Sequence, residues 1–317
     1  MRTGFFLLLM LFSVALKGQT QVQLIDWENL KNPVYSHPGW STKDACMARN
    51  DDWFYLFFSA FFYDSGEERS HVVSVKTKDF KTFSEPVFVW NGMEKGWKGL
   101  CSPDITKNGN TWILTFNSWG DIKDKPNQLF FSTSKDLVNW SEMQPLAMNI
   151  TSGIRAIDAG IIHFNSKVYL VWKKQQEPLI AVADSLNDTG WKILGRPVNV
   201  WFENGQFICI DGQLFLMATS RNHRPSLAKM KGNGFSDDNW LRWTDFSEIN
   251  VPVEDYNTNE AANAASLADW RAFDGYFYLI YAGRTEGESH KGRGNNKLAF
   301  MRSADMKKWE LPGKVKK

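Results

Sequence analysis

The chain has 317 residues, carries 37 Lys and Arg against 35 Asp and Glu, and is rich in aromatic residues, with 15 Trp and 23 Phe. A near-neutral chain without a basic run excludes proteins that hold nucleic acid or an anionic membrane surface by charge. After residue 20 no apolar stretch approaches the roughly 18 residues of a membrane span.

Residues 1–20 have the pattern of a secretory signal peptide. Arg2 precedes an apolar run over residues 5–16, which is followed by small and polar residues. This order is typical of a cleavable signal, and the run is too short to span a bilayer. The first cysteine is Cys46, so we expect no lipid anchor at the cleavage point. The sequence therefore predicts a secreted or periplasmic protein, with residues 21–317 as a single domain.

From residue 44 onward the chain repeats one pattern: an acidic residue, a strand, a turn, and a second strand that ends in an aromatic residue and Leu. The turns, such as Asn108-Gly109 and Asp211-Gly212, favour tight hairpins. Four copies span 44–56, 104–114, 158–170 and 203–216, and a fifth over 265–283 lacks the leading carboxylate.

A second pattern follows the first: a strand, a turn of Ser or Thr, Lys, Asp and an apolar residue, and then Trp or Phe. Its copies span 74–83, 131–140, 181–191 and 298–309. Five repeats that each supply one four-stranded sheet bury their faces best by closing into a ring. We therefore predict an all-β, five-bladed β-propeller. The rival fold, a pair of β-sandwiches, would not explain why one pattern recurs five times.

In a propeller the first strand of each blade runs along the central axis, so the leading residues point into one shared funnel. Asp44, Asp104, Asp158 and Glu203 would then form one acidic pocket. The alternative is that these acids only cap turns and backbone amides at the blade ends.

These motifs resemble glycoside hydrolase family 43 and its five-bladed relatives among arabinosidases, xylosidases and arabinanases. Family members show Asp-Pro at the head of the first blade, Ala-Pro-Asp or similar in the second, Asp-Pro-Ser in the third and Glu-Gly-Pro in a later one. The counterparts here are Asp44-Ala45, Ser102-Pro103-Asp104, Asp158-Ala159-Gly160 and Glu203-Asn204-Gly205. The blade order agrees over nearly the whole mature chain.

The chain also departs from the family pattern. Proline is absent after Asp44 and Asp158, and residues 262–266 read Ala-Asn-Ala-Ala-Ser where many relatives place a His associated with a cation. The resemblance therefore indicates a divergent branch, for which we expect no cofactor and no bound metal.

The resemblance implies an inverting hydrolysis with Asp44 as the base that activates water and Glu203 as the acid that protonates the leaving oxygen. Asp158 would orient the acid and raise its pKa, as a neighbouring negative charge does. Asp104 would line the sugar pocket and bind hydroxyls.

Further residues near the leading acids are candidates for sugar binding. Three tryptophans, Trp40, Trp119 and Trp201, are placed to stack on sugar rings, although packing between blades is the other interpretation for each. Arg221, His223 and Arg284 are candidates for binding ring hydroxyls or a uronate carboxylate, unless they form a solvated face.

The leading hypothesis is an exported glycosidase that acts on plant or algal polysaccharides or oligosaccharides. The alternative is a carbohydrate-binding propeller that has lost hydrolysis. A five-bladed phosphorylase, which uses a single carboxylate acid, fits less well because three carboxylates are kept. The sugar, the linkage, exo or endo action and the oligomeric state stay open.

Overall fold

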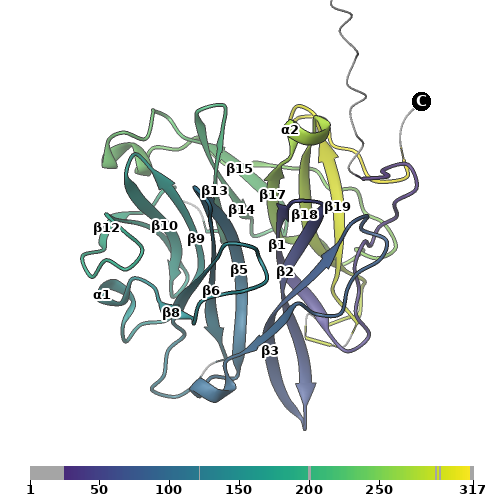
Figure 1. The fold of residues 1–317 in the computed structure, drawn as a ribbon, viewed down its shortest axis with the longest axis horizontal. Helices are drawn as coiled ribbons and strands as arrows, with labels where there is room; N and C mark the ends of the chain where they lie inside the picture. The colour runs from purple at the N-terminus through teal and green to yellow at the C-terminus, as the bar shows by residue number, and fades with distance from the viewer. Residues whose placement is uncertain (1–24, 121, 199–200, 290, 293, 315–317) are drawn as a thin grey trace, which may run out of the picture.

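The computed structural model describes residues 25–120, 122–198, 201–289, 291–292 and 294–314, so the predicted signal peptide lies outside the described residues. Nearly all regular structure in these ranges is β-strand, in consecutive antiparallel units (Figure 1). None of their helices is long and apolar enough to cross a membrane.

Five antiparallel units follow one another along the described chain. The first contains β1 (Ser41–Asn50), β2 (Trp53–Asp64), β3 (Glu67–Thr77) and β4 (Phe88–Asn91), and the second contains β5 (Gly99–Asn108), β6 (Thr111–Trp119), β7 (Leu129–Ser134) and β8 (Gln144–Pro145). The third contains β9 (Ala156–Phe164), β10 (Lys167–Lys174), β11 (Glu177–Ala183) and β12 (Lys192–Gly195). The fourth contains β13 (Glu203–Ile210), β14 (Gln213–Thr219), β15 (Pro225–Lys229) and β16 (Ser247–Glu248), and the fifth contains β17 (Glu260–Asp269), β18 (Phe277–Arg284) and β19 (Lys297–Ser303).

The helical elements are short and lie in the connections. They are α1 (Met148–Thr151), α2 (Arg271–Asp274) and the 3-10 turns η1 (Met93–Lys95) and η2 (Asp237–Leu241). The first two units are joined by a single parallel pair, Ser70 with Gly99, whereas all other pairings between strands are antiparallel.

The hairpin turns explain why the first pattern folds as paired strands. Asn165 and Ser166, between β9 and β10, both have positive φ, as do Asp211 and Gly212 between β13 and β14. Two consecutive residues with positive φ define the turn whose twist matches that of the flanking strands. The hairpin predicted at Asp211 and Gly212 is therefore confirmed.

The recurrent Ser/Thr-Lys-Asp turn is a structural device. The Oδ1 atom of Asp136 accepts hydrogen bonds from the backbone amides of Val138 at 2.9 Å and Asn139 at 2.7 Å. Asp79 and Asp305 bond the amides two and three residues ahead in the same way. A carboxylate that satisfies backbone amides replaces the next ladder bonds and turns the chain.

The units close into a ring around the first strands. β1, β5, β9, β13 and β17 contact each other in this order, and β17 contacts β1; Figure 1 shows them grouped in the middle of the molecule. Each pair of neighbouring units encloses its own cluster of buried apolar side chains. Sheets that bury both faces against neighbours in a closed ring are the arrangement of a propeller. The all-β propeller prediction is confirmed.

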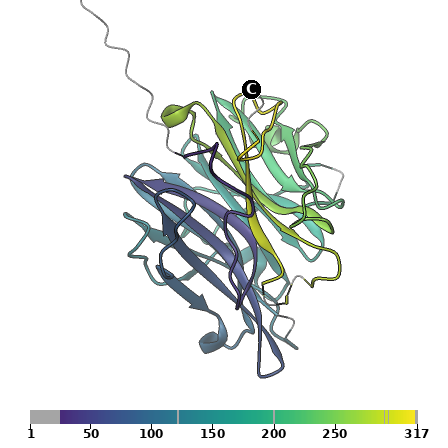
Figure 2. The same cartoon turned by 90° about the vertical axis from the view of Figure 1, so that its right-hand side faces the viewer.

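The beginning of the described chain seals this ring. Tyr35 pairs with Leu298 of β19, and the side-chain amide of Asn32 exchanges hydrogen bonds of 2.7 and 2.8 Å with the backbone of Phe300. Figure 2 shows the yellow strands of the last unit running beside the purple start of the chain. The two ends of the domain therefore stabilise one another.

Candidate active site

Each first strand carries a β-bulge at a residue with left-handed backbone geometry. These residues are Asp44, Ser102, Asp158, Asn204 and Ala264, with φ of 53°, 53°, 58°, 50° and 48°, and the pairing register of every first strand shifts beside them. All five line one small cavity on the axis, so the bulges converge. A bulge redirects the side chains next to it, and that is how the first strands present polar groups at one end of the ring.

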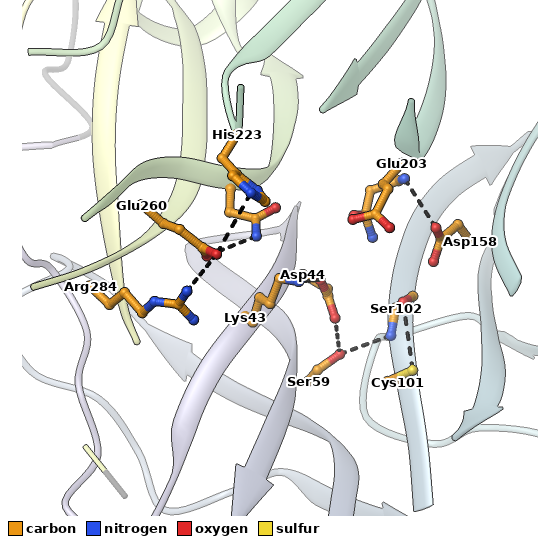
Figure 3. A network of polar contacts seen from close by, with 12 residues as sticks. Lys43, Asp44, Ser59, Cys101, Ser102, Asp158, Glu203, His223, Glu260 and Arg284 are labelled. Atoms are coloured by element: carbon orange, nitrogen blue, oxygen red, sulfur yellow. Dashed lines mark hydrogen bonds and ion pairs between the residues drawn. The ribbon is translucent and has the colours of Figure 1, made fainter. Parts of the chain in front are cut away.

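A cavity of about 390 Å³, here called the funnel, opens beside these bulges. The three carboxylates predicted to be catalytic, Asp44, Asp158 and Glu203, line it together with Trp119. They come from the first, third and fourth units, and Figure 3 shows them around a common space. The structure therefore brings together the three acids that the repeat pattern singled out.

Asp44 is held by a chain of buried hydrogen bonds. The hydroxyl of Ser59 on β2 donates to Asp44 Oδ2 at 2.7 Å and accepts from the backbone amide of Ser102 at 2.8 Å (Figure 3). Burial raises the pKa of Asp44, and Lys43 and the Ser59 hydroxyl offset part of that rise. Ser59 therefore fixes the direction of this carboxylate and favours its ionised form.

Lys173, near the end of β10, lies between the other two acids. Its Nζ atom is 2.9 Å from Glu203 Oε1 and 3.6 Å from Asp158 Oδ2, and its side chain is only 2% exposed. Burial raises the pKa of Glu203, but the ammonium groups of Lys43 and Lys173 outweigh burial and hold the pKa below its usual value. In the free protein Glu203 is therefore an ionised, ion-paired carboxylate.

Lys43 is a second cation in the funnel, with its side chain 17% exposed and Nζ 3.8 Å from Asp44 Oδ1. Burial alone would lower the pKa of this lysine, but the surrounding carboxylates outweigh burial and raise it. Those carboxylates belong to Asp44, Glu203, Glu260 and Asp158. The two lysines thus balance much of the negative charge that the acids bring together.

The fifth unit contributes an acid that the sequence pattern did not reveal. Glu260, at the start of β17, is buried and accepts a 2.7 Å hydrogen bond from Arg284 Nη2. His223 Nε2 lies 3.9 Å from Glu260 Oε1 (Figure 3). Asn263 donates to Oε2 at 3.0 Å. Two of the residues predicted to bind substrate, His223 and Arg284, therefore face a carboxylate beside Lys43.

The three candidate tryptophans occupy different environments. Trp119 lines the funnel and meets Phe61 edge-on, with ring centres 5.4 Å apart. Trp40 stacks on His37 with ring centres 4.0 Å apart and packs against the apolar cluster between the first and fifth units. The structure therefore places Trp40 in packing between units. Trp201 lines a second cavity, together with Arg221.

Asp104 is placed differently from the sequence expectation. It lies two residues beyond the bulge of β5, where Ser102 holds the position equivalent to Asp44, and it lines the small axial cavity instead of the funnel. Burial raises its pKa to about 8, although hydrogen bonds from Ile105 and Gln206 offset part of the rise. Near neutral pH this group is therefore a protonated acid on the axis, below the funnel.

Lys43, Lys173 and Glu260 are the site residues that sequence reasoning missed. Lys173 could have been found from the sequence, because it directly follows an apolar run from Val168 to Trp172, whose side chains are buried. A lysine at the end of a buried strand requires a partner charge. Lys43 stood next to a predicted base, whereas nothing in the local pattern distinguished Glu260.

Comparison with known proteins agrees with this geometry. The model of the glycosyl hydrolases family 43 matches residues 30–221. The chain belongs to this family. It is a glycosidase by family membership, and the resemblance noted from the motifs is confirmed. A search of curated proteins with this chain finds no match.

Solved structures share the fold at low sequence identity. A glycosyl hydrolase from Bacteroides ovatus superposes with a TM-score of 0.62 and 15% identity, covering 87% of each chain. Xyloglucan PUL GH43B of the same organism gives a TM-score of 0.59 and 17% identity over 89% of this chain and 56% of that one. The Bombyx mori GH32 β-fructofuranosidase BmSUC1 gives 0.58 and 15%, over 86% and 63%. At these identities the likeness concerns the fold.

Proposed function

We propose that this family 43 glycosidase is exported and cleaves glycosidic bonds of plant or algal polysaccharides or oligosaccharides with inversion. The observation that carries the proposal is the meeting of Asp44, Asp158 and Glu203, from three different units, in one funnel. Export rests on the signal-like pattern of residues 1–20.

In the proposed reaction Asp44 acts as the base. Its carboxylate takes a proton from a water molecule as that water attacks the anomeric carbon. The Ser59 hydroxyl, 2.7 Å from Oδ2, and the Lys43 ammonium, 3.8 Å from Oδ1, favour the ionised form that this role requires. Burial acts in the opposite direction and makes the carboxylate more basic, which helps the proton transfer.

Glu203 acts as the acid and must be protonated when the bond breaks. In the free protein Lys43 and Lys173 together hold it ionised, with Lys173 in direct contact, so substrate binding has to be accompanied by proton uptake at Glu203. A sugar that enters the funnel displaces water and inserts its glycosidic oxygen near Oε1, which weakens the hold of the ammonium and favours the neutral acid. Asp158, 3.6 Å from the same ammonium, offers Lys173 a second partner in that state.

The same ion pair is the observation that favours the second candidate, a propeller that binds carbohydrate without cleaving it. If Lys173 never releases Glu203, the funnel recognises hydroxyl groups but has no proton to give to the leaving oxygen. Both candidate proteins bind carbohydrate, but only the glycosidase cleaves it.

The test is hydrolysis of aryl glycosides and oligosaccharides by the wild type, Asp44→Asn and Glu203→Gln. The panel contains α-L-arabinofuranosides, β-D-xylosides and β-D-galactosides. Glu177→Gln, a carboxylate on β11 whose side chain is 47% exposed, is the matched control. Turnover that disappears in the two funnel variants and persists in the control supports the proposal, and proton NMR of the first product anomer reports inversion.

The acid role has its own readout. A leaving group of low pKa needs little protonation, so Glu203→Gln should lose far less activity on a 2,4-dinitrophenyl glycoside than on an oligosaccharide. Equal losses on both would refute Glu203 as the acid. Saturable sugar binding without turnover on any substrate would establish the second candidate.

A further inference from the structure

A second cavity of about 430 Å³ lies on the fourth unit, next to the funnel. Its wall starts at Trp201 and Phe202, directly before Glu203 begins β13. The rest comes from the segment after β14, from β15, and from β16 with Phe246 directly before it. The funnel wall includes Glu203, so consecutive residues of the chain line the two cavities.

One side chain joins the cavities. The Nζ atom of Lys173 is 2.9 Å from Glu203 Oε1 and 4.8 Å from the centre of the Trp201 ring. The indole nitrogen of Trp201 donates to Gln176 Oε1 at 3.2 Å, which anchors the ring edge. Trp201 therefore forms a wall of the second cavity, and a single ammonium group separates it from the carboxylate that we assign as the proton donor.

The walls of the second cavity combine aromatic rings with fixed polar groups. Phe246 meets Phe202 edge-on with ring centres 5.3 Å apart, and the guanidinium carbon of Arg221 lies 5.7 Å from the Trp201 ring centre. Glu248 Oε1 accepts hydrogen bonds from Ser220 at 2.7 Å and Asn222 at 3.0 Å. Aromatic faces suit the C–H face of a sugar ring, and a held carboxylate with a guanidinium suits its hydroxyl groups.

The position of the catalytic acid indicates which part of the substrate the second cavity binds. The acid of a glycosidase protonates the oxygen of the leaving group, so the leaving group lies on the acid's side of the broken bond. The second cavity is on that side, because its Trp201 wall lies 4.8 Å from the ammonium group that pairs with Glu203 Oε1 at 2.9 Å. We propose that this cavity binds the sugar unit that leaves, and that the substrate is therefore an oligosaccharide or polysaccharide chain with a sugar on both sides of the cleaved bond. This inference rests on the proposed function.

The test compares two substrates of one sugar. For the panel member that the wild type cleaves, we would measure kcat/KM on the trisaccharide and on the methyl glycoside, whose leaving group is too small to reach the second cavity. Trp201→Ala and Phe246→Ala should each lower kcat/KM on the trisaccharide by roughly tenfold or more. On the methyl glycoside, Phe246→Ala should change kcat/KM less than about twofold. Trp201→Ala also removes a ring 4.8 Å from Lys173 Nζ, so for this variant the ratio of kcat/KM between the two substrates is the readout. Phe235→Ala removes a phenyl ring that is 64% exposed elsewhere, and is the control for loss of an aromatic side chain.

Equal losses on both substrates, or no loss on the trisaccharide, would overturn the subsite while leaving the glycosidase intact. If the wild type cleaves nothing, the proposed function fails, and calorimetric titration of xylotriose, α-1,5-arabinotriose and β-1,4-galactotriose into the wild type decides the subsite. Binding that weakens in both Trp201→Ala and Phe246→Ala would support it. Binding that the variants leave unchanged, or absence of binding of all three trisaccharides, would overturn it.

Discussion

Replacing Lys173 by Met removes the ammonium group from the centre of the acid cluster and keeps the length and bulk of the side chain. The removed charge lies 2.9 Å from Glu203 Oε1 and 3.6 Å from Asp158 Oδ2. At an effective dielectric constant of ~20, these separations correspond to attractions of about 6 and 5 kcal/mol before desolvation is counted. Desolvation of the lysine, whose side chain is 2% exposed, cancels a large part of this gain.

The net effect is visible in the pH dependence of the reaction. Glu203 is active only when protonated, so kcat/KM falls as pH rises through the pKa of Glu203 in the free enzyme. Lys173 lowers that pKa, so its removal should move the basic limb of the profile to higher pH. We expect a displacement on the order of one to three pH units, the usual effect of one close opposite charge on a carboxyl group.

The assay is kcat/KM against pH for the wild type, Lys173→Met and Lys173→Arg, with thermal unfolding recorded for each. Lys173→Arg keeps the charge and should keep the limb near its original pH. Lys174→Met, the same change at the next and exposed residue of β10, is the control. The other charged groups around Glu203 stay in all variants; they are Lys43, Asp44, Asp158, His223, Glu260 and Arg284. A folded Lys173→Met enzyme whose basic limb does not move would refute the reasoning.

Two further predictions concern residues around the funnel. Ser59→Ala should lower kcat/KM by roughly 10- to 100-fold, because a hydrogen bond to a charged group contributes about 1.5–3 kcal/mol; the control is Ser74→Ala, since the hydroxyl of Ser74 is buried without a partner and its loss should leave kcat/KM unchanged. Equal losses in both serine variants would contradict the positioning role of Ser59. Asp104→Asn should become more stable relative to the wild type as pH rises from 5 to 8, by at most about 1.4 kcal/mol per pH unit. The pKa of Asp104 is about 8 in the folded protein and lower in the unfolded chain. Between these two values only the unfolded chain loses the proton, so the wild type loses stability as pH rises toward 8. The amide of the variant does not titrate and shows no such loss. Unfolding temperatures whose difference is constant across this pH range would exclude a protonated Asp104.

The repeated hairpins could be predicted because their information is local. Asp211 and Gly212 both have positive φ, which these residue types tolerate, and the strands on either side of them pair with each other. Five such units in one chain leave five sheets to be packed, and ring closure follows from the need to bury both faces. The acidic residues that lead three of the repeats, Asp44, Asp158 and Glu203, could be predicted from the same repeated pattern.

The sequence predicts less accurately which residue of each first strand stands at the bulge. Asp104 and Ser102 are two residues apart on β5, and only the bulge at Ser102 decides which of them corresponds to Asp44. A strand alternates its side chains with a period of two, so a one-residue bulge redirects the chain without any change in composition. The sequence therefore predicted an acid in the funnel where the structure has a serine, and missed Glu260 in the fifth unit.

The amino-acid sequence by itself determined the strand units, their closure into a ring and three of the acids that meet in the funnel, because turn preferences and strand periodicity act between near neighbours in the chain. The tertiary structure alone decided the charge state of those acids. Lys173 lies next to the end of the second strand of the third unit and Glu203 begins the first strand of the fourth, yet their charged atoms are 2.9 Å apart. The energy of that pair depends on distance in space and on burial, and neither is contained in the separation of two residues along the chain.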